Sequence, residues 1–194
     1  MQRAVKRAFD VTFSLSAIII LSPLWIIVAA AVLVSSPGGI FFSQKRTGYH
    51  GRTFKMLKFR SMVINSEADE QQADDDNDPR TTAFGRFLRR SSIDELPQLW
   101  NVFVGDMSLI GPRPHMLAHT EYYSALIPDY MRRHDMRPGL TGYAQILGYR
   151  GATPHVEDME KRVKADLEYI DNYSLWLDMK IFFITVARIA RLKL

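Results

Sequence analysis

The sequence contains no cysteine, and this absence excludes two kinds of site. Without thiols the chain has neither disulfide bonds nor thiolate metal ligands, and it fits a reducing compartment. Its 194 residues are enough for one domain with a buried core and an appendage. The formal net charge of +4 indicates an anionic partner, either nucleic acid, a membrane surface or a phosphorylated substrate.

Charge is also missing from residues 11–34, which are apolar apart from Thr12 and a few serines. About 20 such residues span a bilayer as a helix, so the length indicates a membrane segment. Two features argue against a straight span. Ser22 and Pro23 lie near the middle, where a proline removes a backbone hydrogen bond and bends a helix. Basic residues also flank both ends of the stretch: Arg3, Lys6, Arg7, Lys45, Arg46 and Arg52.

The positive-inside rule would place both flanks of this segment in the cytoplasm. A re-entrant helix, bent at Ser22–Pro23 so that it enters and leaves on one membrane face, satisfies both features and is favoured over a straight span. The Ser22 hydroxyl is the nearest partner for the backbone group that Pro23 frees. The apolar run is too long for a secretory signal, and no clean cleavage site follows it. We therefore divide the chain into a membrane helix, residues 1–36, and a cytoplasmic-face domain, residues 37–194.

The remaining chain predicts a mostly helical α+β fold with a small β-sheet. Residues 40–46 and 53–60 are rich in aromatic residues and flank a loop bounded by glycines, which predicts a β-hairpin. On its second strand Lys58 and Arg60 share one face, where two cations suit a pyrophosphate, although a solvated strand face is an equal alternative. Residues 67–80 predict an acidic solvated loop. Residues 83–90 and 176–194 are basic and amphipathic, which is typical of helices at a membrane surface.

Two adjacent acids, Asp94 and Glu95, form the centre of the pattern. Ser91 and Ser92 precede them at the spacing of a capping box, which predicts a helix start with both carboxylates in its first turn. A capped helix with two solvated acids is the simpler interpretation. Solvated acids need no cations, however, and three arginines come just before the pair: Arg86, Arg89 and Arg90. This arrangement indicates a nucleophile that acts on phosphate.

Two further basic loops follow the acids. Arg113 stands between Pro112 and Pro114, which fix its backbone before any ligand arrives and suit a phosphate or a flat base. Arg137 opens a second loop rich in proline and glycine, and Gln145 lies on a predicted strand, residues 143–147. Arg150 lies in a third turn. No nucleic-acid motif is present, so binding to nucleic acid is not expected.

Six motifs in this order resemble the bacterial sugar transferases, the monotopic phosphoglycosyl transferases that begin surface-glycan assembly on polyprenol phosphate. They cover essentially the whole chain. The matching stretches are residues 6–10, 22–23, 58–62, 89–98, 105–114 and 137–145.

The resemblance implies a covalent reaction. A UDP-sugar would donate hexose-1-phosphate to undecaprenyl phosphate and release UMP, with Asp94 as nucleophile, Glu95 as its partner and Mg²⁺ held near Asp94. It also implies that Arg113 belongs to the nucleotide site and that Arg89 contacts a phosphate. The protein would lie in the bacterial inner membrane with its catalytic domain at the cytoplasmic face. Family members also occur as longer chains, so this sequence is either a short form or a fragment.

The sugar is less constrained. Residues 148–151 read Gly-Tyr-Arg-Gly where many members carry Gly-Arg-Asn, and this region resembles the glucose-1-phosphate transferases of the colanic-acid type. Glucose is therefore the first choice, with galactose or an N-acetylhexosamine as alternatives. A homodimer is one alternative for the oligomeric state. A non-enzymatic membrane adaptor would explain the charge and the amphipathic stretches, but not the acid pair among arginines.

Overall fold

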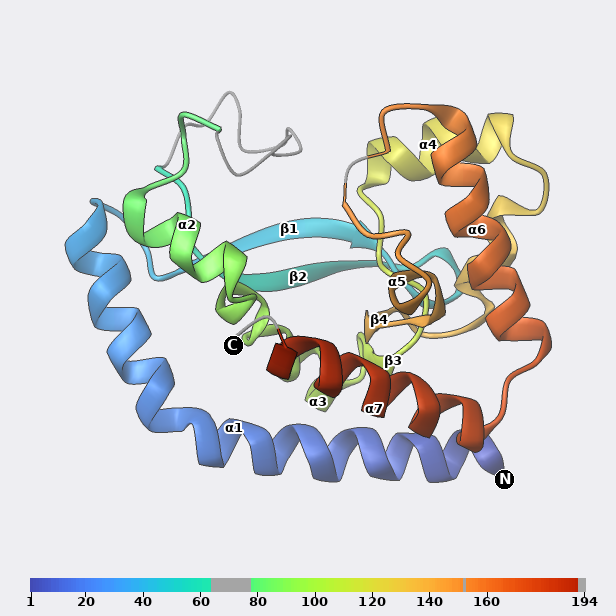
Figure 1. The fold of residues 1–194 in the computed structure, drawn as a ribbon, viewed down its shortest axis with the longest axis horizontal. Helices are drawn as coiled ribbons and strands as arrows, with labels where there is room; N and C mark the ends of the chain where they lie inside the picture. Colours follow the sequence, from blue (N-terminus) through green and yellow to red (C-terminus); the bar gives the residue numbers. More distant parts are fainter. Residues whose placement is uncertain (64–77, 152, 192–194) are drawn as a thin grey trace.

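The computed structural model describes residues 1–63, 78–151 and 153–191, so most of the predicted acidic loop lies outside it. The fold is α+β and mostly helical, as predicted (Figure 1). Its α-helices are α1 (Gln2–Ser35), α2 (Ala83–Arg90), α3 (Gln98–Val104), α4 (Leu117–Leu126), α5 (Tyr143–Ile146), α6 (Val156–Asp171) and α7 (Leu175–Arg191). Short 3₁₀ helices are η1 (Tyr49–Gly51), η2 (Ile93–Glu95) and η3 (Tyr130–Asp135).

Helix α1 is bent partway along its length (Figure 1), and Pro23 lies inside it. Proline has no N–H to donate to the carbonyl four residues earlier, which belongs to Ile19. The Ser22 hydroxyl donates to this same carbonyl at 2.8 Å, as the sequence predicted. Few of the apolar side chains on α1 are covered, and Ile20 and Ile26 are more than 70% exposed. Among the described residues α1 is the one helix long and apolar enough to cross a membrane, which fits a membrane protein.

The predicted hairpin is confirmed. Strands β1 (Phe41–Thr47) and β2 (Thr53–Phe59) pair antiparallel, with Phe42 opposite Lys58 and Arg46 opposite Phe54. Strand β2 alternates between buried and open positions, and Phe54 and Met56 point into the main core. The hairpin therefore presents Lys58 near one end and its η1 turn at the other.

A second sheet consists of two short parallel strands, β3 (Ser108–Ile110) and β4 (Gly139–Thr141). The loops around it approach so closely that glycine is required. A Cβ on Gly111 would lie 2.2 Å from the carbonyl oxygen of Arg137, and one on Gly139 would lie 2.1 Å from the backbone nitrogen of Gly111. This contact fixes where the Pro-Arg-Pro loop leaves β3.

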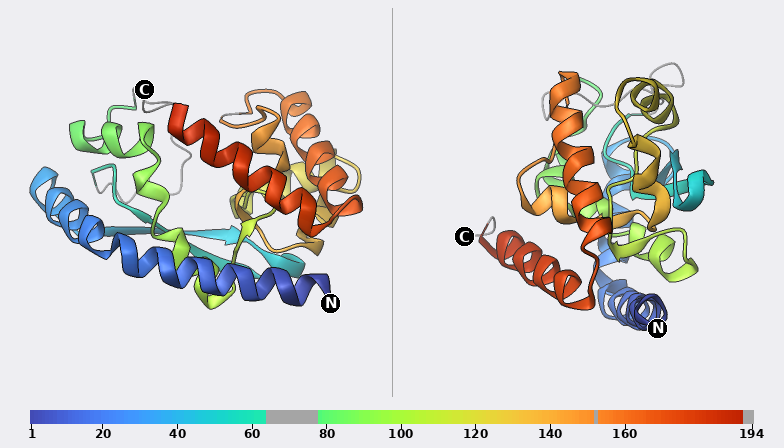
Figure 2. Two further views of the ribbon diagram at one scale, coloured as in Figure 1. Left: turned by 60° about the horizontal axis from the view of Figure 1, so that its bottom comes forward. Right: turned by 90° about the vertical axis from the view of Figure 1, so that its right-hand side faces the viewer.

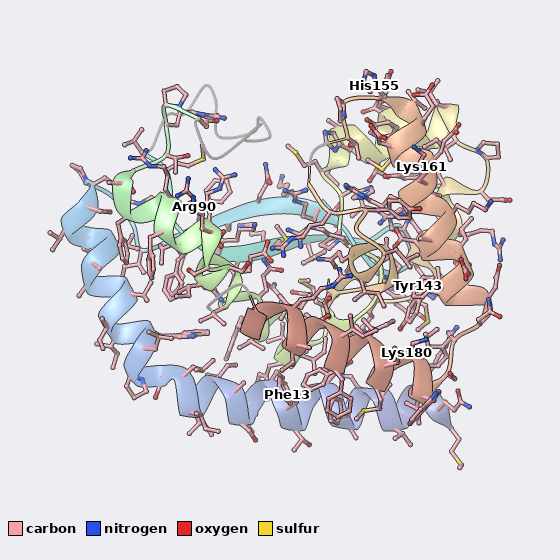
Figure 3. All side chains as sticks on the ribbon, viewed as in Figure 1. Phe13, Arg90, Tyr143, His155, Lys161 and Lys180 are labelled. Atoms are coloured by element: carbon pink, nitrogen blue, oxygen red, sulfur yellow. The ribbon has the colours of Figure 1, made fainter. Side chains whose placement is uncertain are left out.

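The first half of α7 packs against the first part of α1, and Figure 2 shows the two helices diverging from there. Phe13 lies where the two helices meet (Figure 3), and its ring is 5.4 Å from that of Phe182. Lys6 Nζ also contacts Asp178 Oδ2 at 2.8 Å, with both side chains at most 10% exposed. Trp176 and Phe183 remain largely exposed on α7. This open apolar face agrees with the prediction of an interfacial helix.

One predicted element is wrong. Residues 143–147 were expected to form a strand, but residues 143–146 form the single-turn helix α5. A five-residue segment with four apolar or aromatic residues cannot by itself distinguish a short strand from one helical turn. Packing of α5 against α6 and α7 decides the outcome here.

Candidate functional site

The acid pair lies on η2, between α2 and α3. The predicted capping box is wrong, because the Ser91 hydroxyl donates back to the carbonyl of Phe87 at 2.8 Å and Ser92 makes no side-chain cap. Ser92 instead adopts a left-handed conformation with φ of 57°. A non-glycine residue in this region carries strain of about 1–2 kcal/mol. The reversal ends α2 and points the Asp94 side chain inward, where it is only 9% exposed.

The two carboxylates have different partners. Glu95 Oε1 accepts from Lys58 Nζ at 3.1 Å and from Arg113 Nη2 at 2.5 Å. Asp94 Oδ2 is 3.8 Å from Lys58 Nζ, which is an electrostatic contact rather than a hydrogen bond. Lys58 comes from β2 and Arg113 from the loop after β3. Three separate parts of the chain therefore meet at the acid pair.

The pKa values of the two acids shift in opposite directions. Burial raises the pKa of Asp94, while Lys58, Arg89 and Arg113 only partly offset that effect and the neighbouring Glu95 adds to it. Burial would also raise the pKa of Glu95, but Arg113 and Lys58 together hold it well below its usual range. Adjacent acids whose pKa values are separated in this way suit different chemical roles. Glu95 stays ionised and anchors the cations, whereas Asp94 remains available.

Arg113 is held from its backbone as well as its side chain. Pro112 and Pro114 flank it as predicted, and the Pro112 carbonyl accepts from Gly139 N at 2.9 Å. The carbonyl of Arg113 accepts from Arg133 Nη2 at 2.7 Å. Arg133 is in turn paired with Asp166 of α6 at 2.6 Å, and both side chains are at most 2% exposed.

Sequence reasoning missed the Arg133–Asp166 pair, and it also missed Arg46. Arg46 extends from β1 beside Arg113 and Glu95, and burial together with the charge of Arg113 lowers its pKa to about 10. Its buried Nε has no hydrogen-bond partner among the described residues. Two neighbouring guanidinium groups repel each other and favour the approach of an anion. The one available signal was its position in the basic segment 45–46, which we assigned only to membrane topology.

Arg89 and Arg150 lie at the edge of the site. Arg89 on α2 lowers the pKa of Asp94, and its Nη1 is 3.4 Å from Thr81 Oγ1. Arg150 is exposed and donates from Nη2 to Ser92 Oγ at 3.1 Å, which links the loop after α5 to the turn before η2. The structure thus brings Arg89 near Asp94 and Arg150 to the turn that precedes it.

Two expected site residues, Arg60 and Arg137, contact groups outside the acid pair. Arg60 is 6% exposed and donates to the carbonyls of Ser36 and Pro37, so it fastens the end of α1 instead of sharing a face with Lys58. Arg137 donates to Gly105 O at 3.0 Å and stacks on Tyr49, in a different pocket. The Gln145 Oε1 is buried without a partner among the described residues. These side chains are placed by long-range packing, which local spacing does not show.

The expected Mg²⁺ can be compared with these groups. In the part of the chain that the structure describes, no three histidine or acidic residues cluster to form a metal cage. Mg²⁺ does not require such a cage, because it commonly binds through one or two carboxylates together with substrate phosphates. Asp94 makes no direct hydrogen bond to a cation among the described residues, so its carboxylate fits this type of binding, whereas Glu95 already accepts from two cations.

The long apolar helix fits a membrane protein, and the cations that converge on two buried carboxylates form its candidate site. The sequence matches the bacterial sugar transferase family over residues 1–191. The chain therefore belongs to this family.

Curated relatives give the match more detail. A UDP-glucose:undecaprenyl-phosphate glucose-1-phosphate transferase of Escherichia coli (strain K12) is 49% identical over 186 residues, which cover 96% of this chain and 40% of the relative. The chain thus spans about two-fifths of that protein. The exopolysaccharide production protein PSS of Rhizobium leguminosarum bv. phaseoli is 44% identical, with 96% of this chain and 95% of the relative covered. A UDP-N-acetylgalactosamine-undecaprenyl-phosphate N-acetylgalactosaminephosphotransferase of Aeromonas hydrophila is 42% identical, with 95% and 43% covered.

Proposed function

We propose that this chain transfers hexose-1-phosphate from a UDP-sugar to undecaprenyl phosphate and releases UMP. The observation that carries the proposal is the difference between the two acids: Glu95 binds Lys58 and Arg113, whereas no cation in the described part of the chain is hydrogen-bonded to Asp94. Membership of the sugar transferase family supports the reaction class. The named substrates of the relatives support the donor and the acceptor.

In the first step the Asp94 carboxylate attacks the β-phosphorus of the UDP-sugar. A bond forms between Asp94 Oδ and phosphorus, and the bond to the bridging oxygen breaks, so that UMP leaves with that oxygen. In the second step a phosphate oxygen of undecaprenyl phosphate attacks the same phosphorus. The Asp94 ester bond breaks, and the free carboxylate and a lipid diphosphate sugar are the products.

The surrounding cations offset the charge that opposes this chemistry. Two anionic substrates must meet a carboxylate, so Lys58, Arg46 and Arg113 lower the electrostatic cost of bringing them together. When bound through Asp94 and substrate phosphates, Mg²⁺ supplies further positive charge for the transferred phosphoryl group. The pairing of Glu95 with Lys58 and Arg113 holds both cations at the edge of the reacting carboxylate.

The sugar is proposed to be glucose, because relatives near 49% identity are named for glucose, whereas one at 42% is named for N-acetylgalactosamine. We also propose that α1 is re-entrant, so that the site faces the cytoplasm at the bacterial inner membrane. The Ser22–Ile19 hydrogen bond supports this topology, since it satisfies a carbonyl within the apolar segment. The proposed pathway is the synthesis of exopolysaccharide or another surface glycan, and the Rhizobium relative is named for exopolysaccharide production.

The first test is product analysis with UDP-glucose, undecaprenyl phosphate and Mg²⁺ in detergent. UMP is expected, and UDP would refute phosphosugar transfer in favour of plain glycosyl transfer. If neither nucleotide appears with any UDP-sugar, the chain is an adaptor instead. Omission of Mg²⁺ with a chelator present is expected to abolish turnover.

The covalent step is tested with Asp94→Asn, which removes the nucleophile but keeps the shape of a buried side chain. Loss of turnover is expected, together with loss of the protein mass increase that UDP-glucose alone produces in the wild type. Membrane binding should be unchanged. Asp171→Asn is the matched control, because Asp171 is exposed and pairs with Arg132 away from the site. Wild-type turnover by Asp94→Asn would exclude the covalent mechanism.

A further inference from the structure

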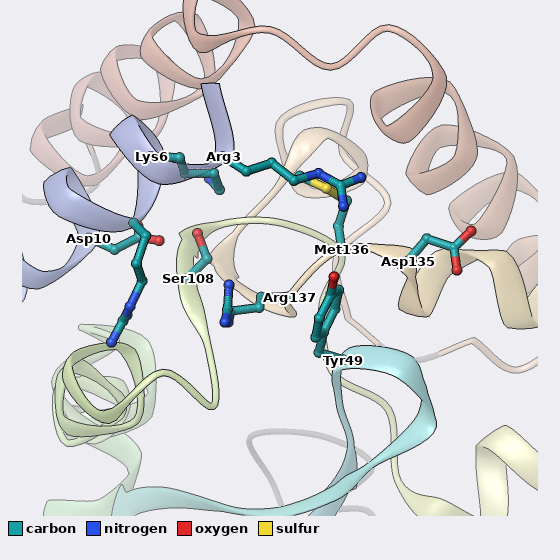
Figure 4. Close-up of a pocket in the computed structure, with 9 residues that line it drawn as sticks. Arg3, Lys6, Asp10, Tyr49, Ser108, Asp135, Met136 and Arg137 are labelled. Carbon is teal, nitrogen blue, oxygen red and sulfur yellow. The ribbon is translucent and has the colours of Figure 1, made fainter. Parts of the chain in front are cut away.

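A second basic pocket lies between the start of α1, the η1 turn and the segment before β4 (Figure 4). None of its lining residues belongs to the acid pair or to the cations that contact it. Arg3 from α1 and Arg137 border it, together with Tyr49 and Ser108. Arg137, which sequence reasoning assigned to the substrate site, therefore faces a different space.

Two of the four cations that line the pocket have other partners. Lys6 is paired with Asp178. Arg7 donates to the carbonyls of Val102 and Phe103 at 2.6 and 2.7 Å, which uses both of its terminal nitrogens. Both residues therefore serve to hold α1 against the domain.

The other two cations retain donors. Arg137 uses Nε for Gly105 O and rests on the Tyr49 ring, with 5.2 Å between Cζ and the ring centroid. This stacking fixes the plane of the guanidinium, and its terminal nitrogens make no hydrogen bond to any described residue. Arg3 is exposed and makes no hydrogen bond or ion pair within the described ranges. Figure 4 shows both guanidinium groups at the pocket. Two arginines with open donors suit a phosphate group.

Ser108 adds a polar group to the pocket. Its side chain is fully buried, and its hydroxyl makes no hydrogen bond of ordinary geometry to a described residue, although the Asp10 carboxylate lies close enough to interact with it. A buried polar group without a partner is unfavourable, so native structures rarely leave one unpaired. An anion oxygen in the pocket would accept the Ser108 hydroxyl.

Two acids, Asp10 and Asp135, also line the pocket, and their negative charge opposes the binding of an anion. Asp10 is 2% exposed, and its Oδ1 accepts from the Leu109 N–H at 3.0 Å. Asp135 is exposed at the far side from Asp10 (Figure 4). Against these two acids stand four cations, Arg3, Lys6, Arg7 and Arg137, so the lining keeps a positive balance.

Apolar side chains next to the pocket indicate where it lies relative to a bilayer. On the same turns of α1, Val5 and Phe9 are 49% and 42% exposed. Trp176 is 80% exposed, and it lies two residues from the Asp178 that pairs with Lys6. Exposed tryptophan beside basic residues is typical of the headgroup region of a membrane. The α1 turns that line the pocket therefore also carry exposed apolar side chains of the kind that a membrane surface covers.

We propose that this pocket binds the phosphate group of a membrane phospholipid and so fixes the start of α1 at the membrane surface. Arg3 and Arg137 would donate to the phosphate oxygens, and Ser108 would add a third donor. Free phosphate offers the same chemistry, so the test must separate a lipid headgroup from a soluble ion. The site is separate from the Asp94 reaction, and no acceptor or donor substrate is needed to test it.

The experiment uses native mass spectrometry of the full chain released from detergent with added lipid. The probes are phosphatidylglycerol, diacylglycerol with the same acyl chains, and inorganic phosphate. Wild type is expected to bind phosphatidylglycerol about tenfold more tightly than diacylglycerol, as one or two charge-assisted hydrogen bonds would give. The double variant Arg3→Gln/Arg137→Gln should lose this preference. Arg132→Gln/Lys161→Gln removes the same charge from exposed positions outside the pocket (Lys161 is labelled in Figure 3) and should keep it.

Each outcome decides the question. If both double variants lost the preference for phosphatidylglycerol equally, the preference would be a general charge effect, and the proposed lipid site would be refuted. Displacement of phosphatidylglycerol by millimolar inorganic phosphate, with no preference over diacylglycerol, would identify a free-anion site instead of a lipid site. If Arg137→Gln lowers the melting temperature, the double variant is replaced by two single variants, Arg3→Gln and Arg137→Lys. Arg3→Gln should weaken binding, and Arg137→Lys should retain most of it.

Discussion

Replacing Lys58 with methionine should move the acid limb of the pH–rate profile to higher pH. Asp94 must be ionised to attack phosphorus, so the rate falls as the pH drops through its pKa. Burial raises that pKa, and Lys58 is the largest influence that lowers it. Methionine keeps the length of the side chain and removes the charge. Arg89 and Arg113 would remain to favour the carboxylate, and Glu95 would remain to oppose it.

The size of the effect follows from the distance. Lys58 Nζ lies 3.8 Å from Asp94 Oδ2. With an effective dielectric constant of about 20, a pair at that distance interacts by roughly 4 kcal/mol, or about three pKa units. Opposite charges at such distances shift pKa values by about one to three units in proteins. We therefore expect the acid limb to rise by about one to three pH units.

The assay is the rate of UMP release from UDP-glucose between about pH 4 and pH 9. This range covers the usual pKa values of carboxyl and imidazole groups. Lys58→Arg keeps the charge and should keep the wild-type limb. Lys55→Met is the matched control, because Lys55 lies exposed on the same strand and is not among the groups that shift Asp94. A Lys58→Met profile that keeps the wild-type acid limb, with only its height reduced, would refute the assignment of this limb to Asp94.

Three other changes test the framework of the site. Asp166→Ala should lower stability by about 3–5 kcal/mol, because it leaves a buried arginine unpaired, and thermal melting in detergent measures this. Gly111→Ala should destabilise by at least about 1–3 kcal/mol, since its Cβ would overlap backbone atoms. The lack of native cysteine allows a clean topology test: Gln2→Cys and Ser43→Cys should react with an impermeant thiol reagent from the same face, and Pro23→Ala should reduce that agreement.

Local features of the fold were predictable from the sequence because local chemistry determines them. The hairpin follows from two short aromatic segments around glycines, and its pairing matches the prediction. The bend in α1 follows from Pro23, and the partner for the freed carbonyl follows from the adjacent Ser22 hydroxyl. Asp94 and Glu95 could be singled out as a pair, although the serines before them do not cap a helix.

The grouping of the arginines was not predictable, because burial and long-range contacts decide it. Arg60 comes two residues after Lys58, yet it points back to the end of α1. Arg46 lies far from Arg113 in sequence, yet the charges of Arg113 and Glu95 both act on it. Arg137 looked equivalent to Arg113 because both lie in rigid proline loops. The two loops pack closely together at Gly111 and Gly139, yet Arg137 contacts Gly105 and Tyr49 whereas Arg113 contacts Glu95.

The adjacency of the two acids has a physical consequence that neither acid would have alone. If Asp94 bound Lys58 and Arg113 directly, those bonds would stabilise the carboxylate and weaken it as a nucleophile. Glu95 takes both hydrogen bonds, at 3.1 and 2.5 Å, and Asp94 receives only the field of Lys58 at 3.8 Å. The cations therefore stay beside the reacting carboxylate of Asp94 without forming hydrogen bonds to it. By this reasoning Glu95→Gln should lower turnover, because it releases Lys58 and Arg113 toward Asp94. It should also move the acid limb of the pH–rate profile to lower pH, because Glu95 raises the pKa of Asp94.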